Sequence, residues 1–367
     1  MKKVKPNKYI ENLSSYKITS QDPWIIDNKK IINKLDWNEG DFVPKIISDE
    51  LVSLSKKEYL YKWYSDYSAH DLHQVLGNYL NVTSNNLLSF PGSDNALECI
   101  CRCYLEYDDK VIMLKPTYDN FEVFAASCGA KLINYQLEKP YNLNFANFIK
   151  FIEKNDPKVI YLVSPNNPCG YIIDPEQVSI ICQKFPETLV ICDQAYIEFA
   201  QYADCKHLVE KFNNIIITRT FSKAFSLAGI RLGYVISNHN ILKIISKIRN
   251  GKNISMISQI IGIKILKNFD KYTKWINSVI HLRDMIYNDL IKLGLVAYKS
   301  HGNFILFEIN SSQLFLAELK RKNVYIRDKI LSTDGGIRIT ITNKKSMNIF
   351  MKILNEYISN KENQFYF

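Results

Sequence analysis

Apolar runs rich in Ile, Leu and Val alternate with amphipathic segments between about residues 84 and 237. The runs that have the length of strands lie at 87–90, 111–114, 131–137, 159–163, 189–192 and 215–218. Because they are apolar at both alternating positions, they are typical of strands buried on both faces of a sheet. Helix-like segments lie between them and begin at Ser93, at Tyr118 and after Pro175. The pattern predicts an α/β fold in which helices cover a mostly parallel sheet.

Beyond residue 237 the periodicity becomes that of helices, at 240–249, 255–268 and 271–293, before strand signals return at 304–309. Shorter helix and strand patterns alternate from there to the carboxyl end. We therefore predict a large α/β domain at 41–265 and a smaller α+β domain at 266–367. Residues 1–40 contain no long periodic segment, and we expect them to form an arm on the small domain or on a neighbouring subunit.

The chain has 367 residues, 47% of them hydrophobic, so it is long enough to bury two cores. Its longest apolar runs fall far short of the roughly 18 residues that cross a bilayer. We therefore expect a soluble cytoplasmic protein with no membrane partner. The net charge of +10 comes mainly from scattered lysines, which is typical of a solvated surface and does not predict a nucleic-acid partner.

The eight cysteines mostly lie in apolar periodic runs, where a reduced thiol behaves as a small hydrophobic side chain. Cys99, Cys101 and Cys103 are spaced so that, on a helix, the middle thiol points away from the outer two. No histidine-rich segment follows them. We predict neither disulfides nor a metal site.

Three polar clusters follow predicted core strands, at the edge where open α/β sheets collect ligands. They are S-P-N-N-P-C-G at 164–170, D-Q-A-Y-I-E-F at 193–199 and T-R-T-F-S-K-A-F-S-L-A-G-I-R-L-G-Y at 218–234. Taken singly, the first is also typical of a rigid turn, and the acid of the second is also typical of a structural ion pair. The third brings together Ser222, Lys223 and Arg231, which suits an anion site beside a nucleophilic amine.

Together, and from about Leu35 to the carboxyl end, these motifs resemble the fold type I pyridoxal-phosphate aminotransferases, most closely the histidinol-phosphate aminotransferase branch. The resemblance implies that pyridoxal 5'-phosphate is the cofactor, that Lys223 is the Schiff-base lysine, and that Asp193 partners the pyridine nitrogen. It also implies that Tyr196 and Asn167 donate hydrogen bonds to the ring's 3-oxygen. The other implied cofactor ligands are Ser222 and Arg231 at the phosphate, the backbone of Gly92, Ser93 and Asp94 at a helix amino terminus, and Tyr118 on the ring.

Elementary chemistry agrees with these roles. Pyridoxal phosphate accepts electrons while its ring nitrogen is protonated, and a carboxylate such as that of Asp193 favours the protonated form. The freed amine of Lys223 can carry the proton from the substrate's Cα to the cofactor. A helix amino terminus, an arginine and a hydroxyl compensate the charge of the phosphate. We therefore expect Lys223, Asp193 and Tyr196 to be the catalytic residues.

The resemblance also implies how substrates bind. Arg338 corresponds to the arginine that holds the amino acid's carboxylate, and Arg327 to the one that holds the phosphate of a phosphorylated substrate. Tyr16 and Asn38 complete the expected substrate-binding set. Tyr64 lies where the family has a tyrosine that reaches the cofactor phosphate of the neighbouring subunit, so the expected active unit is a homodimer.

These roles predict an aminotransferase of amino-acid biosynthesis that moves an amino group between a glutamate-like donor and a small phosphorylated compound of the histidinol phosphate type. The sequence departs from the family on the substrate side. N-E-G-D at 38–41 replaces N-E-N-P, Gln194 replaces the usual glutamate, and Gly302 replaces the usual alanine.

Several alternatives stay open at this point. Within the cofactor class they are an aminotransferase for another phosphorylated ketone, for instance in a surface-carbohydrate pathway, and an amino-acid-phosphate decarboxylase. A non-catalytic binding protein on the same fold is a more remote alternative. A serine acyl-transferase would use S-D-N at 93–95 and S-x-x-K at 53–56, but its K-T-G element is absent. A dinucleotide enzyme is disfavoured because no G-x-G-x-x-G follows a strand.

Overall fold

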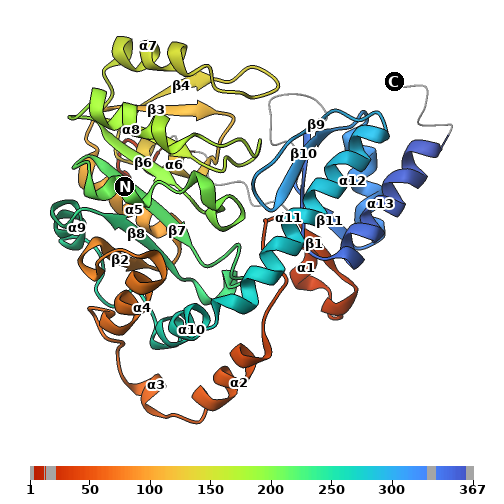
Figure 1. Ribbon diagram of the computed structural model, residues 1–367, viewed down its shortest axis with the longest axis horizontal. Helices are drawn as coiled ribbons and strands as arrows, with labels where there is room; N and C mark the ends of the chain where they lie inside the picture. Colours follow the sequence, from red (N-terminus) through yellow and green to blue (C-terminus); the bar gives the residue numbers. More distant parts are fainter. Residues whose placement is uncertain (1–3, 12, 14–21, 329–335, 361–367) are drawn as a thin grey trace.

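The computed structural model describes residues 4–11, 13, 22–328 and 336–360 of the chain. A large α/β unit and a smaller α+β unit lie beside each other, and the long helix α11 (Phe269–Lys292) runs from one towards the other (Figure 1). Within the described ranges, no helix is both long and apolar enough to span a membrane. All eight cysteines are free thiols.

The large unit is built on a seven-stranded sheet in the order β2, β8, β7, β6, β5, β3, β4. Its strands are β2 (Leu87–Phe90), β3 (Lys110–Lys115), β4 (Lys131–Gln136), β5 (Val159–Val163), β6 (Leu189–Asp193), β7 (Ile215–Thr220) and β8 (Gly233–Ser237). In this sheet β8 runs antiparallel to β2 and β7, and the other neighbouring pairs are parallel. The predicted mostly parallel sheet is therefore confirmed.

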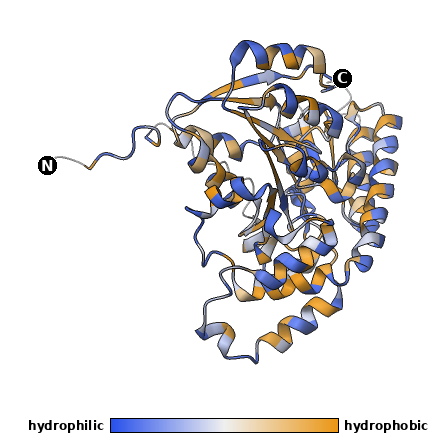
Figure 2. Cartoon of the chain, turned by 60° about the vertical axis from the view of Figure 1, so that its left-hand side comes forward, coloured by the Kyte–Doolittle hydropathy of each residue, from blue (hydrophilic) through white to orange (hydrophobic). Residues whose placement is uncertain are grey.

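Helices cover both faces of this sheet, as Figure 1 shows. One hydrophobic core gathers α5 (Ser93–Tyr104), α6 (Asn120–Ser127) and α9 (His239–Ser246). The other gathers α4 (His70–Leu80), α7 (Phe145–Asn155), α8 (Pro175–Lys184) and α10 (Met256–Leu266). Figure 2 shows hydrophobic strands at the centre of the molecule between these layers. Burial on both sides explains why β5, β6 and β7 are apolar at both alternating positions.

Helix α7 was not expected from the sequence pattern. The side chain of Asn144 caps it by accepting a hydrogen bond from the backbone N–H of Asn147 at 3.1 Å. Phe148 and Ile152, one helical turn apart, bury its inner face.

The smaller unit has a three-stranded antiparallel sheet in the order β12, β10, β9. Its elements are β9 (Ala297–Tyr298), β10 (Phe304–Glu308), α12 (Ser312–Arg321), β12 (Gly336–Thr340) and α13 (Lys344–Ser359). The outer helices close over the sheet through aromatic contacts, because the Phe350 ring packs edge-on against both Phe307 and Phe315. This unit therefore has buried apolar contacts of its own.

The segment before residue 41 contacts both units. Its end joins the smaller unit, because β1 (Asn33–Leu35) pairs in parallel with β11 (Val324–Ile326). Nearer the amino terminus, the ring of Tyr9 stacks on Tyr107 of the large unit, with ring centroids 5.6 Å apart, and Figure 2 shows this end projecting from the body. The remaining short helices are α1 (Asp22–Ile25), α2 (Lys45–Leu54), α3 (Tyr59–Lys62) and the 3-10 turns η1 (Lys29–Ile31), η2 (Ser84–Asn86), η3 (Ile197–Phe199), η4 (Gln201–Ala203), η5 (Lys206–Glu210) and η6 (Ala228–Ile230).

Strand register brings the ends of the central strands to one edge of the sheet. Val163 pairs with Asp193, and Asp193 pairs with Thr218, so β5, β6 and β7 end within a few residues of one another. In parallel sheets the carboxyl ends share an edge, and here that edge carries all three polar clusters found in the sequence.

The start of β8 packs closely against the start of α5. A Cβ atom on Gly233 would come within 2.6 Å of the Gly92 carbonyl carbon, 2.7 Å of the Ser93 nitrogen and 2.9 Å of the Arg219 carbonyl oxygen. These are backbone atoms, which cannot turn aside as a flexible side chain would. Glycine at this position therefore sets how closely the sheet and the helix approach each other.

We expect Gly233→Ala to lower the free energy of unfolding by about 1 to 3 kcal/mol, because the added methyl group forces backbone apart in a packed core. Urea unfolding of both proteins measures the difference. Gly229→Ala is the matched control, since a Cβ there meets nothing within 4 Å. Equal stability of the two variants would contradict the close-approach argument.

Candidate active site

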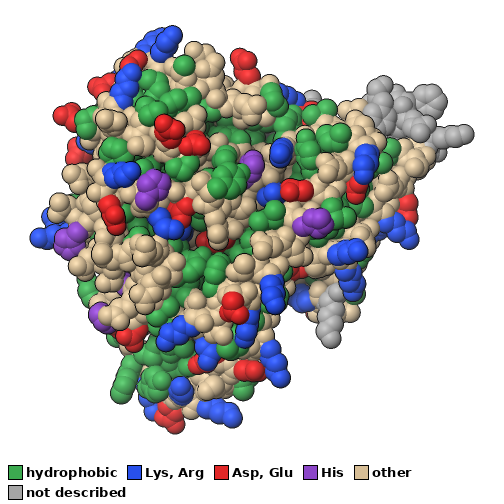
Figure 3. All heavy atoms as spheres, viewed as in Figure 1, with side chains coloured by type: hydrophobic (Ala, Val, Ile, Leu, Met, Phe, Trp, Pro, Cys, Tyr) green, Lys and Arg blue, Asp and Glu red, His purple; other side chains and the backbone are tan. Residues whose placement is uncertain are grey.

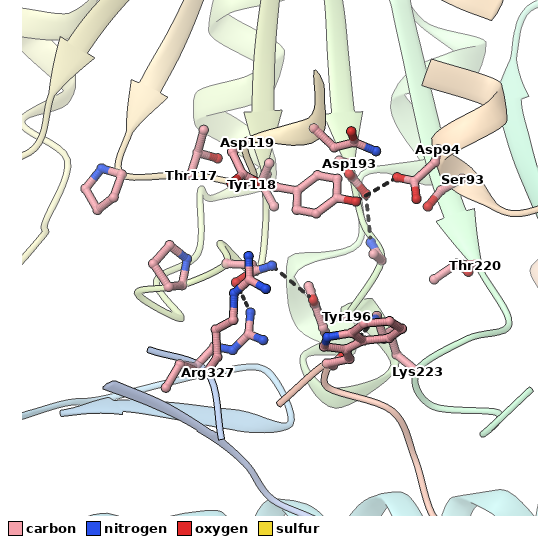
Figure 4. Close-up of a pocket in the computed structure, with 18 of the residues that line it drawn as sticks. Ser93, Asp94, Thr117, Tyr118, Asp119, Asp193, Tyr196, Thr220, Lys223 and Arg327 are labelled. Carbon is pink, nitrogen blue, oxygen red and sulfur yellow. Dashed lines mark hydrogen bonds between the residues drawn. The ribbon is translucent and has the colours of Figure 1, made fainter. Parts of the chain in front are cut away.

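A cavity of about 1010 Å³ opens at the carboxyl edge of the large sheet, facing the smaller unit. Figure 4 shows Asp94, Tyr118, Asp193, Tyr196, Lys223 and Arg327 around it. Of the residues singled out in the sequence, those that line this cavity are Gly92, Ser93, Asp94, Tyr118, Asn167, Asp193, Tyr196, Ser222, Lys223, Arg231, Arg327 and Arg338. The cavity thus collects residues from β3, β4, β5, β6 and β7, from the start of α5 and from β12 of the smaller unit.

Lys223 follows the end of β7, and its Nζ donates a hydrogen bond of 2.7 Å to the backbone carbonyl of Trp37. Burial lowers the pKa of Lys223 to about 8; Glu39 opposes this effect and Arg338 adds to it. A pKa of this size leaves roughly a tenth of the amine neutral at pH 7, far more than an ordinary lysine has, and the neutral amine is the nucleophilic form.

Asp193 is the last residue of β6 and is almost fully buried. Its Oδ2 accepts a hydrogen bond of 2.8 Å from the Tyr161 hydroxyl, and its Oδ1 accepts one of 3.2 Å from the Ala195 N–H. Burial raises the pKa of Asp193 to about 6, although the hydrogen bond from Tyr161 opposes the rise. A cation placed next to this carboxyl group would favour its ionised form.

Hydrogen-bond donors gather at the other end of the cavity, where α5 begins. Gly92 precedes this helix with φ 88° and no side chain caps the first turn, so its backbone N–H groups are open to a ligand. A Cβ on Gly92 would lie 2.5 Å from Arg231 Nη2, so glycine also lets the guanidinium approach. The hydroxyls of Thr220 and Ser222, 2.9 Å apart, stand at the same end of the cavity. This donor set suits a phosphate group.

Tyr196 is held from two sides. Its hydroxyl oxygen accepts hydrogen bonds from Asn167 Nδ2 at 3.3 Å and from Asn38 Nδ2 at 3.1 Å. The ring packs edge-on against Phe304, with centroids 5.0 Å apart. A Cβ on Gly302 would overlap this Phe304 ring, which gives a packing reason for glycine where the family has alanine.

Asn38, expected to bind substrate, is fully buried behind the cavity wall. Its backbone is left-handed, with φ 56°, and its side chain connects Tyr196 to Thr340 of β12, whose hydroxyl donates to Asn38 Oδ1 at 3.1 Å. The structure therefore places Asn38 as a link between the smaller unit and Tyr196.

The side chains of Tyr118 and Asp94 are hydrogen-bonded to each other. The Tyr118 hydroxyl donates a hydrogen bond of 2.9 Å to Asp94 Oδ1, as Figure 4 shows. The sequence indicated only the backbone of Asp94, whereas the structure adds a side-chain contact that fixes the direction of the Tyr118 ring.

Arg338 and Arg327 come from the smaller unit. Their backbones form an antiparallel bridge, Arg327 N to Arg338 O at 3.1 Å and the reverse at 3.0 Å, and both side chains line the cavity. Arg338 is almost fully buried and donates to Asn167 Oδ1 at 2.5 Å and to the carbonyl of Asp36.

Of the expected residues that the structure describes, Asn38 and Tyr64 do not line this cavity. Tyr64 is 73% exposed near α3, with Lys252 Nζ 4.0 Å from its ring centroid. Tyr16 lies outside the described residues.

Sequence reasoning missed three contributors. Tyr161 holds Asp193, Thr220 lines the anion end, and Trp37 holds Lys223 through a backbone carbonyl. A tyrosine inside a fully buried strand needs a hydrogen-bond partner for its hydroxyl. This requirement is the sequence signal that could have identified Tyr161. A backbone contact such as that of Trp37 leaves no signal in the residue pattern.

Gln194, which replaces the family's glutamate, belongs to a buried polar cluster beneath the cavity. Arg219 Nη2 donates to Gln194 Oε1 at 2.8 Å and forms an ion pair with Asp204. Burial alone would raise the pKa of Asp204, but Arg219 and contacts with Lys206 outweigh it and lower the pKa. The negative charge that balances Arg219 therefore comes from position 204, and residue 194 can be neutral.

The loop N-E-G-D is tied to the long helix. Asp41 Oδ1 accepts a hydrogen bond of 3.1 Å from Trp275 Nε1, and Oδ2 accepts one from Asn343. A Cβ on Gly40 would lie 2.6 Å from the Lys223 carbonyl oxygen and 2.8 Å from the Trp275 ring, so a side chain there does not fit. These contacts explain both departures from N-E-N-P.

The cavity fits pyridoxal phosphate on structural grounds. A buried carboxylate, an amine of lowered pKa and a glycine-lined helix amino terminus with an arginine stand at one cavity, and these are the groups that its ring nitrogen, aldehyde and phosphate require.

We expect cofactor-free Asp193→Asn protein to lose less stability than the wild type as pH rises from 4 to 7. The folded pKa of Asp193, about 6, lies above the ordinary 3.8, so its stabilisation is present below pH 3.8 and is lost as pH rises through 6. The difference amounts to about 3 kcal/mol. Urea unfolding across this pH range measures it. Parallel pH profiles for the two proteins would show that Asp193 ionises as it does in water.

Comparison with known proteins bears out the fold and the cofactor. The chain matches the family described as aminotransferase class I and II over residues 16–354. A dihydroxyacetone phosphate transaminase of Campylobacter jejuni is 31% identical over 359 residues, covering 96% of this chain and 97% of that protein. A histidinol-phosphate aminotransferase of Thermoanaerobacter sp. is 31% identical over 354 residues, covering 95% of this chain and 99% of that protein.

A crystal structure of histidinol-phosphate aminotransferase from Sinorhizobium meliloti in complex with pyridoxal-5'-phosphate has a TM-score of 0.84 at 24% identity and covers 96% of both chains. This likeness confirms the expected fold type. With the family match over most of the chain and the cavity built for the cofactor, the protein belongs to the class I and II aminotransferases and is a pyridoxal-phosphate-dependent transaminase.

Proposed function

We propose that this enzyme moves an amino group from a glutamate-like amino acid to a small phosphorylated ketone, with an amine product of the histidinol phosphate type. The observation that carries the proposal is the pair Arg327 and Arg338. Their backbones are bridged where Arg327, just past β11, meets Arg338 within β12, and both residues line the cavity that contains Lys223. Like charges on opposed strand positions repel each other, which favours anionic ligands between or beside them.

Two arginines suit a reaction whose two substrates carry different anions. Arg338, with its guanidinium fixed by Asn167 and the Asp36 carbonyl, would hold the α-carboxylate of the donor. Arg327 would hold the phosphate of the acceptor, and the planar guanidinium fork suits both anions. One cavity can then bind donor and acceptor in turn.

Pyridoxal phosphate, when bound, supplies an aldehyde that takes up the amino group and a ring that stabilises the electron pair left on the substrate's Cα. Lys223 Nζ would take the proton from that carbon and return it during the second half of the reaction. Its lowered pKa of about 8 suits an amine that must both lose and gain a proton near neutral pH.

The other cavity residues would orient the cofactor and stabilise its charges. Asp193 would stand against the protonated ring nitrogen, held in place by Tyr161. Tyr196 would donate from its hydroxyl to the ring's 3-oxygen, since the hydroxyl oxygen already accepts from Asn167 and Asn38. Arg231, Ser222 and the first turn of α5 would hold the phosphate.

The overall exchange is balanced. The donor loses its α-hydrogen and its amino group, takes an oxygen atom from water and leaves as a 2-oxo acid. The ketone gains the hydrogen and the amino group, loses its carbonyl oxygen as water and becomes an amine. No oxidant or reductant is needed, because the cofactor stores the amino group between the two halves.

A phosphorylated ketone from a surface-carbohydrate pathway is the second candidate acceptor, supported by the relative named dihydroxyacetone phosphate transaminase. A decarboxylase would have to hold a carboxylate, instead of the Cα hydrogen, at the reacting position. Incubation with phosphorylated amino acids and measurement of released carbon dioxide separates that activity from amino transfer.

We further propose a cytoplasmic homodimer in which Tyr64 reaches the cofactor phosphate of the neighbouring subunit. Exposed aromatic side chains support an interface around α3, and Figure 3 shows hydrophobic side chains gathered at the lower end of the molecule over this helix. They are Tyr59, Tyr61, Trp63, Tyr64 and Tyr67. Contiguous apolar surface of this kind marks interaction sites. The eight free cysteines agree with a reducing compartment.

We expect borohydride reduction of the yellow holoenzyme, followed by peptide mapping, to place the cofactor label on Lys223. Lys223→Ala should lose the covalent link and turnover, because the variant lacks the buried amine of lowered pKa that would form the link. Label on a different lysine would contradict this role.

If Tyr64 acts across a dimer interface, Tyr64→Phe should be impaired because the partner's phosphate loses a hydrogen-bond donor. Mixed dimers of Tyr64→Phe with Lys223→Ala subunits should then recover part of the activity, since one of their two sites is complete. Verified heterodimers with no recovery would count against a shared site.

Arg338→Ala should slow the glutamate half-reaction, because a charged hydrogen bond in a desolvated pocket contributes about 1.5 to 3 kcal/mol, or roughly ten- to a hundredfold in the specificity constant. Arg327→Ala should lower the specificity constant for the half-reaction of the phosphorylated amine by a similar factor. Single-turnover absorbance changes of the cofactor measure each half-reaction.

The comparison that decides the role of Arg327 uses the same amine with and without its phosphate. The unphosphorylated analogue never uses the contact, so Arg327→Ala should leave its rate nearly unaffected, and the double comparison isolates the coupling. Equal losses for both amines would show that Arg327 is structural.

A further inference from the structure

Trp37 stands at the reacting end of the cavity. Its side chain lines the cavity, and its backbone carbonyl accepts the 2.7 Å hydrogen bond from Lys223 Nζ. The preceding carbonyl, that of Asp36, accepts a hydrogen bond from the Arg338 guanidinium. Two consecutive carbonyls are thus held by the reactive amine and by the proposed carboxylate-binding arginine, so this stretch of backbone is fixed relative to both.

The Trp37 ring is held as well as its backbone. Lys34 Nζ lies 4.0 Å from the ring centroid, within the range of a cation–π contact. The same ammonium group forms ion pairs with Asp36, at 2.9 Å, and with Glu39. Because two carboxylates keep the lysine over one face of the indole, the ring cannot swing away to that side. It therefore presents a rigid surface to the cavity.

Strand register and a hydrogen bond bring Trp37 close to both points that an acceptor must reach. In the parallel pair of β1 and β11, Leu35 lies opposite Ile326, so the chain beyond Leu35 runs alongside the segment that carries Arg327. Trp37 is two residues beyond Leu35 and already contacts Lys223. Trp37, Lys223 and Arg327 line one cavity, so an acceptor that reaches from Lys223 to Arg327 can contact the indole.

We propose that Trp37, clamped by Lys34, limits the acceptor to short, unbranched phosphorylated ketones of the size of dihydroxyacetone phosphate, and disfavours acceptors that carry an imidazole or a ring of similar bulk. The inference rests on the proposed function, because it takes Arg327 as the phosphate site. It keeps the phosphorylated acceptor of that function, but it favours the second candidate acceptor, of the size of dihydroxyacetone phosphate, over one of the histidinol phosphate type.

The test compares two phosphorylated amines on the holoenzyme: 2-amino-3-hydroxypropyl phosphate, the amine that corresponds to dihydroxyacetone phosphate, and histidinol phosphate. Single-turnover conversion of the cofactor from its pyridoxal to its pyridoxamine form, followed by absorbance at several amine concentrations, gives a specificity constant for each. The measured quantity is the ratio of the two constants, because a general folding or positioning defect lowers both together.

We expect the wild type to favour the short amine by about tenfold or more, which is the scale of discrimination by a filled apolar pocket. Trp37→Ala should reduce this ratio by about tenfold or more, chiefly by raising the constant for histidinol phosphate. Trp37→Phe keeps an aromatic ring under Lys34 and should give an intermediate ratio. Lys34→Met should also reduce the ratio in part, because the unclamped indole gains room to move.

Trp275→Phe is the matched control for loss of an indole, since Trp275 lies near the same loop but does not line the cavity. It should keep the wild-type ratio. A wild type that favours histidinol phosphate, or a ratio that Trp37→Ala and Trp37→Phe leave unchanged, would overturn the inference alone. If glutamate converts the cofactor and neither phosphorylated amine does, the proposed function itself fails and this inference fails with it.

Discussion

The organisation of this protein depends on keeping two ionisable groups of opposite charge, Lys223 and Asp193, in one cavity with little access to water. Burial lowers the pKa of the amine to about 8 and raises that of the carboxyl group to about 6, so both move towards neutrality. Because water does not hold these groups, the protein must. A carbonyl of Trp37 and the hydroxyl of Tyr161 do so, and adjacent parallel strands bring the two groups to one edge.

The sequence was sufficient to predict the sheet and most of the cavity, because both follow from local patterns. Strands buried on both faces are apolar throughout, and the polar residues that end them must share an edge once the strands are parallel. Long-range contacts were not predictable in this way. Asn38 reaches Tyr196 and Thr340 across most of the chain, and no spacing rule announces such a link. For the same reason, the sequence could not predict that Asn38 lies behind the cavity wall.

The departures from the family pattern turn out to have packing and charge explanations close to the cavity. Gly40 and Gly302 stand where a side chain would strike Trp275 or Phe304. Gln194 is neutral because Asp204 supplies the charge opposite Arg219. In each case the residue stands next to a large or charged neighbour, so the difference has an explanation in local packing or charge.

The ion pair between Arg219 and Asp204 also connects the reactive amine to a part of the chain that does not line the cavity. Arg219 lies on β7, four residues before Lys223, whereas Asp204 belongs to the irregular connection between η4 and η5. A guanidinium buried without its counterion is strongly unfavourable, so the position of β7 depends on that connection. Residues outside the cavity lining therefore help to fix the strand that leads to Lys223.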